Sequence, residues 1–561
     1  MSVSGRWRFA LAATAVAAVT LLFRLLRLTT VPAGLFVDEV LTARNALAWR
    51  LGAEPDWLGA RPLLVQGWVE TSHLYLAFAS MVMRAFGDDL VGVRMISALP
   101  GLACVPLLYW LGREVAERRA ALLAALLLGV GHWAARTGRT GWDQVLMTAL
   151  QLAALALLAR GARLGRAWPG AGAGGVLGLA LHTYVASRVV AAHALLWQAW
   201  ECFSAPPAGE TGTAGEEPAR DRRPTARRRL ALLVAALVLV AAPFHVRLLR
   251  ERPEQLVLRA RQLSALAVEG PGEPWSTLAE SAVAHLGMFH LRGGTYARDA
   301  LPGFPMLDPV TGLLLLAGLV VVAQRGGWRR RLLLSWPAVG LLAGVLSVSG
   351  EAPPYPYRVG HLAPWACLVA GLGGIALWDA ARRRLGPRAA VAAAALALIA
   401  VVAINGWVLF VAGPLYPGNV RVYGVAATTV GRWLAAHRGG RPALVHREAL
   451  APPAPARPHP HSAANSTDHM RPVDRAATVQ LAAGVWRAAP RRSLDPLAAR
   501  GDVDVVDRLP AEPPAGAVLI LPVAEAAATA ARRPASRPHV LRLPDGTPFA
   551  VALEPVARPR G

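Results

Sequence analysis

Residues 220–249 read RDRRPTARRRLALLVAALVLVAAPFHVRLL, an arginine cluster followed by a long apolar run. A helix that crosses a bilayer needs about 20 mostly apolar residues, and residues 230–249 supply them. The rest of the chain repeats this pattern. Of its 561 residues 54% are hydrophobic, and its mean hydropathy is +0.38. These values are too high for a soluble multidomain protein and predict an all-α polytopic membrane protein.

The apolar runs predict about eleven membrane spans, and arginine clusters separate many of them. The positive-inside rule places such clusters in the cytoplasm, which predicts a cytoplasmic N-terminus and an extracytoplasmic C-terminus. Residues 73–86 are apolar too, but this run is short and contains Arg84, so we expect it to lie along the membrane surface. The predicted spans are 9–27, 91–111, 119–135, 142–159, 171–186, 188–201, 230–249, 308–324, 332–349, 361–380 and 389–412. The basic clusters are 113–119, 160–166, 220–229, 325–331 and 382–388.

The net charge of +24 comes nearly all from arginine. A basic excess can indicate nucleic-acid binding, but here the arginines lie between apolar runs, so we expect no nucleic-acid partner. Cys104, Cys202 and Cys367 are far apart and predict neither a metal site nor a disulfide framework. The N-terminal apolar run lacks a small-residue cleavage site and is predicted to be an uncleaved first span.

The composition changes after about residue 412. We predict a transmembrane domain over 1–412, with a first extracytoplasmic loop over 28–90, and a small extracytoplasmic α/β appendage over 413–561. Proline-rich residues 450–475 are typical of disorder. The appendage is predicted to contain a helix at 425–437 and strands at 443–446, 503–506, 517–521, 539–543 and 549–553, the last two joined at Asp545-Gly546 as a hairpin.

Asp38 and Glu39 form an acidic pair just beyond the first span. Val40, Ala43 and Leu47 follow at helical spacing, which predicts a helix over 39–51 lying on the membrane. Two interpretations of Asp38 remain open. It caps this helix, or it is a general base whose proton affinity is raised by the nearby hydrocarbon.

Glu70 lies in the same loop, three residues before His73. It is interpreted either as a solvated loop residue or as a group that orients a substrate or binds a divalent cation together with His73. One glutamate and one histidine do not make a metal site, so the sequence leaves the metal undetermined and no cofactor is certain.

Three further outer segments carry polar candidates. Arg139 and Asp143, at i and i+4, form a surface ion pair, or Arg139 binds a phosphate, for which its planar fork is suited. His182, Tyr184 and Arg188 follow one another between two spans. There His182 is either a satisfied core histidine or a ligand, and Arg188 either extends to the headgroups or contacts substrate.

Arg358 follows two tyrosines just before the span that begins at 361. Tyrosine and arginine are ordinary anchors at the membrane interface. The alternative is that Arg358 contacts an anionic lipid headgroup.

Several of these segments together resemble a known family. The chain is similar, over roughly residues 9–412, to the family 39 glycosyltransferases of the GT-C class, in particular the bacterial branch that resembles protein O-mannosyltransferases. The segments that carry the resemblance are Pro32-Ala-Gly-Leu-Phe-Val-Asp38-Glu39, Val93-Arg94-Met-Ile-Ser97-Ala-Leu-Pro-Gly101, Gly178-Leu-Ala-Leu-His-Thr183-Tyr184 with Arg188, Leu286-Gly-Met-Phe289, and Leu301-Pro-Gly303 with Leu307-Asp308-Pro309.

The resemblance implies a GT-C-like fold and a mechanism. A sugar carried on a polyprenyl phosphate would be transferred with inversion to an acceptor hydroxyl of a protein, lipid or glycan at the outer face of the cell membrane. It maps the family's aspartate to Asp38, as the base, with Glu39 as its acidic neighbour. Glu70 lies where related aminoarabinose transferases carry a loop glutamate, although Thr71 and Ser72 replace the Lys-Pro that follows it there.

Arg139, Arg188 and Arg358 are the implied candidates for stabilising phosphate charge as the bond to the sugar breaks. Two other classes remain as alternatives. A flippase or transporter of lipid-linked sugars is typically built from inverted repeats with broken helices, and a catalytically inactive scaffold would act through the C-terminal appendage. The sequence specifies neither the sugar nor the acceptor.

Overall fold

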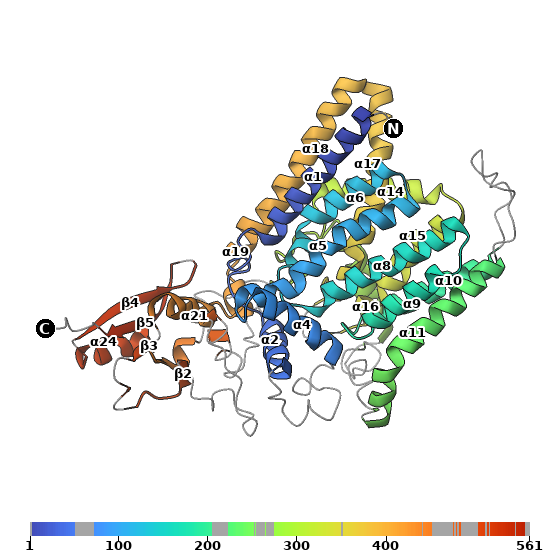
Figure 1. Cartoon of the computed structure of the whole chain (residues 1–561). Coiled ribbons are helices and arrows are strands. Elements are labelled where there is room, and N and C mark those ends of the chain that lie inside the picture. Colours follow the sequence, from blue (N-terminus) through green and yellow to red (C-terminus); the bar gives the residue numbers. More distant parts are fainter. Residues whose placement is uncertain are drawn as a thin grey trace.

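The computed structural model shows a helical bundle joined to a small mixed α/β domain (Figure 1). The C-terminal domain lies beside the end of the bundle that carries α2 and α4. The described residues are 3–50, 72–204, 223–251, 253, 264, 274–348, 352–439, 441–450, 475, 478–479, 482–483, 503–510, 513–514, 517–533, 535–544 and 546–555.

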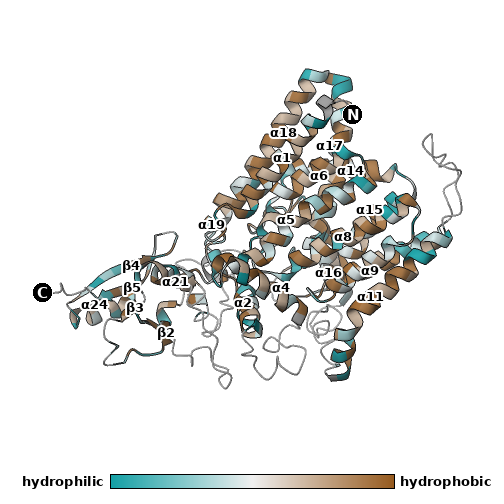
Figure 2. Ribbon diagram, in the orientation of Figure 1, coloured by the Kyte–Doolittle hydropathy of each residue, from teal (hydrophilic) through white to brown (hydrophobic). Residues whose placement is uncertain are grey.

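Six of the described helices are long and apolar enough to cross a membrane. Many of their apolar side chains point outward, for example Leu239 and Leu396, which are 76% and 69% exposed. Figure 2 shows them hydrophobic along most of their length, as expected for a multi-pass membrane protein facing lipid. The six helices are built from α1 (Val3–Leu25), α5 (Leu90–Val115), α8 (Asp143–Leu164), α11 (Arg223–Glu251), α17 (Ala363–Leu385, preceded by η1, Gly360–Leu362) and α18 (Pro387–Trp407, continued by η2, Val408–Ala412).

The other five predicted spans are helical but shorter. The shortest, α9, has 12 residues, which at 1.5 Å per residue extend about 18 Å, against a hydrocarbon core of about 30 Å. The sequence therefore located these segments, and it overestimated the helical length of α9 and α14 but not of α10. They are α6 (Arg118–Val130) with α7 (His132–Thr137), α9 (Pro169–Ala180), α10 (Ser187–Phe203), α14 (Pro309–Ala323), and α15 (Gly327–Gly340) with α16 (Leu342–Val345).

The helices α2 (Val37–Arg50), α4 (His73–Phe86) and α13 (Pro274–Gly287) are also short. Helix α4 covers the run predicted not to cross the membrane. It begins at Ser72, whose hydroxyl accepts a hydrogen bond from the Leu74 amide at 3.2 Å, and it packs in one cluster with α2 and α5. The predicted helix at 39–51 corresponds to α2.

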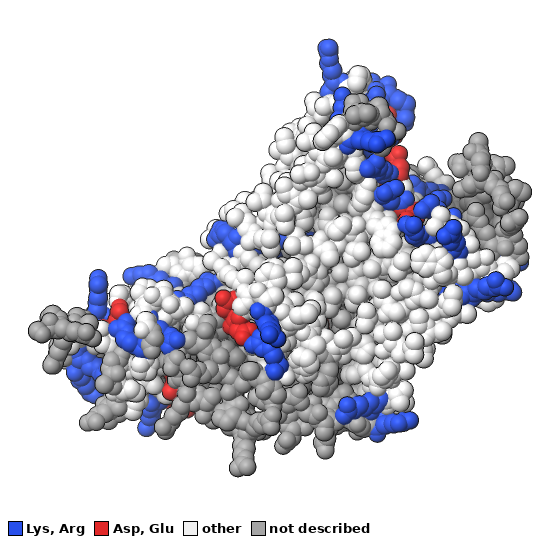
Figure 3. All heavy atoms as spheres, viewed as in Figure 1, with Lys and Arg blue, Asp and Glu red and all other residues white. Residues whose placement is uncertain are grey.

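The predicted basic clusters meet at the opposite end of the bundle. Arg163 of α8 pairs with Glu114 of α5 at 2.5 Å, and Arg331 of α15 pairs with Glu201 of α10 at 2.6 Å. Figure 3 shows arginines along this rim, and further ones on the C-terminal domain. The bundle therefore has an arginine-rich end and an end that carries α2 and α4, which we call the inner and the outer end.

The C-terminal domain is built on a five-stranded sheet in the order β2-β1-β3-β5-β4. Strand β1 is parallel to β2 and β3, whereas β5 is antiparallel to β3 and β4. Its elements are α19 (Gly413–Leu415), α20 (Asn419–Val422), α21 (Val425–His437), β1 (Ala443–His446), η3 (Arg447–Leu450), β2 (Val503–Val506), β3 (Val518–Pro522), α24 (Val523–Ala531), β4 (Ser536–Arg542) and β5 (Pro548–Pro555).

The sequence predictions agree closely with these elements. Helix α21 and strands β1 and β2 have the predicted bounds, and the other three strands differ by one to three residues at either end. Strands β4 and β5 pair as the predicted hairpin; Gly546 has the positive φ of 87° that a tight turn needs, while Asp545 lies outside the described residues. The predicted disordered stretch at 450–475 also lies almost wholly outside them.

Two hydrophobic cores organise the molecule. One fills the helical bundle. The other joins the C-terminal sheet and α21 to residues from the outer end of the bundle, including Phe36, Trp142 and Tyr296. The C-terminal domain is therefore packed against the segments that carry the predicted site.

Candidate functional site

Asp38 lies in the first turn of α2 and is partly exposed. An acidic residue is favoured there by the partial positive charge of a helix N-terminus. The indole Nε1–H of Trp142 donates a hydrogen bond to Asp38 Oδ2 at 3.1 Å. Asp38 is thus held by a side chain 104 positions away in the sequence, which the simple helix-cap interpretation does not require.

Glu39 is almost completely buried. Its Oε2 accepts a hydrogen bond from the Phe36 amide at 2.8 Å, and its Oε1 accepts one from the Gly141 amide at 3.1 Å. Arg94 Nε lies 3.6 Å from Oε1. Burial raises the pKa of Glu39, while Arg94 and the two amides oppose the rise. Glu39 therefore connects α2, α5 and the turn before α8, and does not face the exposed side of Asp38.

Asp143 begins α8, directly after Trp142. Its carboxylate and that of Asp38 are close enough to repel each other. Two neighbouring carboxylates are suited to share a proton or to bind a divalent cation through oxygen. The structure thus separates Asp143 from its predicted partner Arg139 and places it beside Asp38.

Arg298 was not singled out by the sequence, yet it lies against the ring of Trp142, the residue that donates to Asp38. Its guanidinium carbon is 3.8 Å from the ring centre of Tyr357, 4.7 Å from Tyr296, and 5.1 Å from Trp142. It also pairs with Asp299 at 2.6 Å. The rings of Trp142 and Tyr357 stack at 5.9 Å. Arg298 thus fixes the aromatic wall that includes the hydrogen-bond donor of Asp38.

Arg358 approaches the same wall from the loop before α17. Its Nε donates to the Tyr357 hydroxyl at 2.6 Å, and its Nη2 donates to the Val348 carbonyl at 3.1 Å. Among the described residues its buried Nη1 has no hydrogen-bond partner, and an unpaired buried donor is costly. Arg358 can therefore donate to an anion without losing an existing bond.

Tyr184 interacts electrostatically with Tyr357, Arg358 and Asp143. Burial raises the pKa of its hydroxyl, Tyr357 and Asp143 raise it further, and Arg358 opposes the rise. Tyr184 therefore carries a neutral hydroxyl in the vicinity of Tyr357, Arg358 and Asp143. We call the set Asp38, Trp142, Asp143, Tyr184, Arg298, Tyr357 and Arg358 the outer site.

Besides Glu39, three described residues of the predicted site, Arg139, His182 and Arg188, are not part of the outer site. Arg139 is fully buried and donates to the carbonyls of Val31, Phe23 and Leu26 at 2.9, 2.9 and 2.6 Å. All its nitrogens are engaged, so the phosphate-binding interpretation of Arg139 is wrong on geometry, and the predicted surface pair with Asp143 is absent.

His182 is hydrogen-bonded between two neighbours. Its Nδ1 lies 2.9 Å from the Ser72 hydroxyl, and its Nε2 lies 3.2 Å from the Val240 carbonyl. This matches the satisfied-core interpretation. Arg188 is exposed at the start of α10, and Glu70 lies outside the described residues.

His285 of α13 holds the loop that carries Arg358. Its Nδ1–H donates to the Ser281 carbonyl at 2.7 Å, and its Nε2 accepts from the Tyr355 amide at 3.1 Å. This arrangement requires a neutral imidazole. Burial lowers the pKa of His285 from 6.5 to about 4.

We therefore expect acid to loosen this loop. The unfolded chain binds a proton at His285 near pH 6.5 and the folded chain only near pH 4, so stability is full above pH 6.5 and is lost as the pH falls through this window. Hydrogen exchange of residues 352–359 at pH 5 should be faster than at pH 7.5 after correction for intrinsic rates. In His285→Gln, which cannot titrate, the corrected difference should vanish; a difference that persists would contradict this role.

One group of three metal-ligand side chains occurs among the described residues, His446, Glu448 and Glu525, at the end of β1 and the start of α24. The Glu448 amide donates to His446 Nδ1 at 3.3 Å, so the neutral ring carries its proton on Nε2. That nitrogen faces Glu525 Oε2 at 3.9 Å and offers no lone pair to a metal. The contacts of His446 with the Glu448 amide and with Glu525 therefore account for the closeness of the three side chains without a metal.

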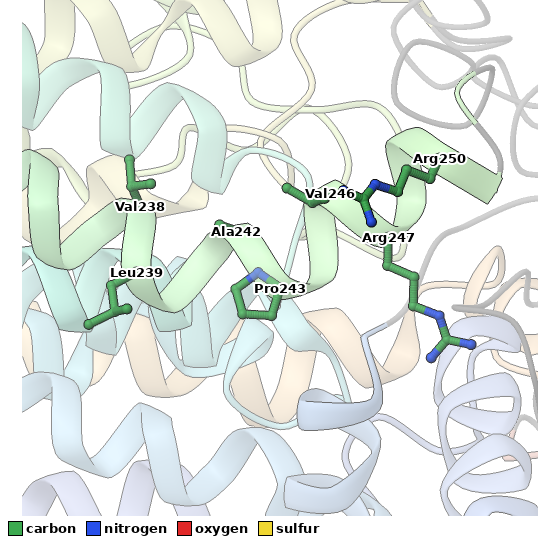
Figure 4. Close-up of a pocket in the computed structure, with 7 residues that line it drawn as sticks. All are labelled: Val238, Leu239, Ala242, Pro243, Val246, Arg247 and Arg250. Carbon is green, nitrogen blue, oxygen red and sulfur yellow. The ribbon is translucent and has the colours of Figure 1, made fainter.

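A hollow of about 580 Å³ lies against the outward side of α11. Figure 4 shows its lining running along the helix from apolar residues to two arginines near the outer end. It is separate from the outer site. Its described lining residues are Val238, Leu239, Ala242, Pro243, Val246, Arg247 and Arg250.

Comparisons with known proteins agree with the resemblance found in the sequence. Residues 72–206 match the family model described as dolichyl-phosphate-mannose-protein mannosyltransferase. No curated protein matches the chain. Among solved structures, ArnT from Cupriavidus metallidurans in the apo state has a TM-score of 0.50 at 13% identity, with 98% of each chain covered.

Two larger proteins also match. The archaeal oligosaccharyltransferase AglB from Archaeoglobus fulgidus, in complex with an inhibitory peptide and a dolichol-phosphate, has a TM-score of 0.47 at 15% identity, covering 86% of this chain. The arabinofuranosyltransferase AftD from Mycobacteria has a TM-score of 0.44 at 16% identity, covering all of this chain. The chain spans only 64% and 42% of their respective lengths. The family match and the ArnT likeness confirm the GT-C membrane fold and the glycosyltransferase resemblance.

Proposed function

We propose, from the premise that this chain has the GT-C glycosyltransferase fold, that it transfers a sugar from a polyprenyl-phosphate donor to an acceptor hydroxyl. Asp38 would act as the base and the anomeric configuration would invert. The observation that carries the proposal is the outer site itself. A carboxylate oriented by an indole N–H and an arginine with an uncommitted donor meet there at one end of a membrane bundle.

The proposed reaction uses few groups. Asp38 takes the proton of the acceptor hydroxyl as its oxygen attacks the anomeric carbon. The bond between that carbon and the phosphate oxygen breaks, and the polyprenyl phosphate leaves with the electron pair. Inversion requires attack from the side opposite the phosphate, so base and phosphate binder must flank the sugar. Trp142 limits the rotation of the Asp38 carboxylate, which favours a productive geometry.

Arg358 is the proposed phosphate-binding residue. Charge accumulates on the phosphate as the bond breaks, and a preorganised donor aimed at that charge is among the strongest catalytic devices. Its Nε and Nη2 bonds fix the guanidinium in the loop, and Nη1 remains for the ligand. Arg298, whose charge is paired with Asp299, holds the aromatic wall.

A divalent cation is a second element of the proposal. Asp38 and Asp143 present oxygen ligands of the kind that Mg²⁺ and Mn²⁺ prefer. A cation held there would neutralise their repulsion and draw in the donor phosphate. A cation bound to the Asp38 carboxylate would occupy the oxygens that otherwise accept the proton of the acceptor hydroxyl, so the effect of a chelator on transfer distinguishes the two arrangements.

The lipid part of the donor fits the hollow on α11. Its apolar lining, which includes Val238, Leu239 and Val246, suits a prenyl chain. Because the inner end carries the arginine clusters, we place it in the cytoplasm by the positive-inside rule. The outer site, the C-terminal domain and the C-terminus would then be extracytoplasmic, and the N-terminus cytoplasmic.

The test uses purified protein in lipid nanodiscs with polyprenyl-phosphate mannose, glucose or arabinose, and native membrane extract as acceptor. Mass spectrometry would follow the release of polyprenyl phosphate and the gain in mass of acceptor, with and without chelator. We expect both signals with at least one donor. Absence of release with every donor would contradict the proposal and favour the transporter or scaffold, neither of which consumes donor.

A further inference from the structure

The segment that precedes Asp38 is held by the C-terminal domain. The Leu35 amide donates a hydrogen bond to Thr428 Oγ1 of α21 at 3.3 Å, and that hydroxyl in turn donates to the Gly424 carbonyl at 3.1 Å. Gly34 lies so close to Tyr423 that a Cβ at this position would overlap the Tyr423 carbonyl. The backbone of residues 34–35 therefore fits directly against the start of α21.

Tyr423 adds a second contact. Its side chain is fully buried, its hydroxyl donates to the Arg298 carbonyl at 2.8 Å, and its ring meets that of Phe36 edge-on at 6.2 Å. One residue of the C-terminal domain thus contacts both the Asp38 segment and the Arg298 loop.

These contacts lead to Asp38 through one more ring. Phe36 packs edge-on against Trp142 at 5.8 Å, and Trp142 donates to Asp38. Two more hydrogen bonds join the bundle to the C-terminal domain here. Arg136 of the bundle donates to the Asn419 side chain, and Arg432 of α21 donates to the Thr29 carbonyl. Leu35 and Phe36 are only three and two residues from Asp38, so a shift of this segment moves the carboxylate.

We propose that Thr428 and Tyr423 are positioning residues of the active site, and that the segment from α20 to α21 is a working part of the enzyme. This inference rests on the proposed function for its kinetic part only. The C-terminal domain would set the position of Asp38 relative to Trp142 and to the acceptor, while donor binding at Arg358 stays largely independent of it.

The chain supplies a matched control. Thr429 is the next residue of α21 and is partly exposed, so Thr429→Val makes the same chemical change beside the contact. Thr428→Ser keeps the hydroxyl that accepts from Leu35 and donates to Gly424, whereas Thr428→Val removes it at nearly constant volume.

The experiment measures amide exchange and kinetics on the full chain in nanodiscs. In Thr428→Val we expect exchange at residues 34–37 to rise about fivefold, as for loss of one ordinary hydrogen bond, and kcat to fall while KM for the donor is unchanged. Thr428→Ser and Thr429→Val should match the wild type in both measurements. Unchanged exchange and unchanged kcat in Thr428→Val would overturn the inference, as would an equal loss in Thr429→Val.

Tyr423→Phe is a second variant, which distinguishes a positioning effect from a general loss of folding. It removes only the hydroxyl that reaches the Arg298 carbonyl and keeps the buried ring. We expect faster exchange at residues 298–300 and a lower kcat without a lower melting temperature; wild-type kcat would contradict the positioning role. Should the wild type transfer no sugar from any donor, the proposed function fails, while the exchange data still decide whether α21 holds the Asp38 segment.

Discussion

Asp38→Asn should reduce sugar transfer by about 10²–10⁴-fold, the range typical of a lost general base, and leave the melting temperature within about a degree of wild type. Asparagine has the same shape, and its Oδ1 can still accept the bond from Trp142. It cannot take the acceptor proton. The measurement is the release of polyprenyl phosphate in nanodiscs, with thermal unfolding recorded on the same samples.

The neighbouring acid provides the control. Glu39→Gln removes the charge that faces buried Arg94, and breaking a buried ion pair costs about 3–5 kcal/mol. We therefore expect Glu39→Gln to lower the melting temperature clearly, the opposite of Asp38→Asn. Wild-type transfer by Asp38→Asn would remove Asp38 from the mechanism, and an unchanged melting temperature in Glu39→Gln would contradict the structural role of Glu39.

Arg358→Gln should lower kcat/KM for the donor by about 10²–10³-fold, the loss seen when one preorganised donor to a developing anion is removed. Arg358→Lys should recover only part of this loss. It restores the charge but not the planar fork that bonds Tyr357 and Val348 and leaves Nη1 for the proposed phosphate. Steady-state kinetics with varied donor would separate loss of binding from loss of rate.

An exposed arginine far from the site checks that net charge alone is not responsible. Arg532, at the end of α24, is exposed, and Arg532→Gln changes the charge by the same amount. We expect its kinetics to match the wild type. If Arg358→Gln behaved like Arg532→Gln, the phosphate would have to be bound elsewhere, with the arginines at the outer end of α11 the next candidates.

Local patterns predicted the elements well. The bounds of β2 and α21 were predictable because their patterns reflect one buried face, whereas β1 was recognisable as a short apolar run that is buried throughout. Span length was less predictable, since apolar side chains continue into turns, as at residues 181–186 after α9. Hydropathy indicates which segments are apolar enough to face lipid, but it does not indicate the residue at which the helical hydrogen bonds end.

The candidate site residues lie together only in part, for a different reason. Asp38, Asp143, Tyr184 and Arg358 lie together as outer-end residues, because the topology brings the ends of separate helices to one face. Arg139 was misinterpreted because its partners are backbone carbonyls, which leave no mark in side-chain spacing. Arg298 was missed because it follows no periodic pattern; its only signal was an Arg-Asp pair in an aromatic loop, Tyr296-Ala-Arg298-Asp299.

The short helices have a consequence for the surrounding lipid. Helices α10, α14 and α15 have 17, 15 and 14 residues, and α10 and α14 expose large apolar side chains such as Leu196 and Leu313. Helices of this length extend about 21–26 Å, less than an average hydrocarbon core of about 30 Å. Hydrophobic mismatch would then thin the bilayer along this flank, and the protein should partition into thinner membranes and be sensitive to acyl-chain length.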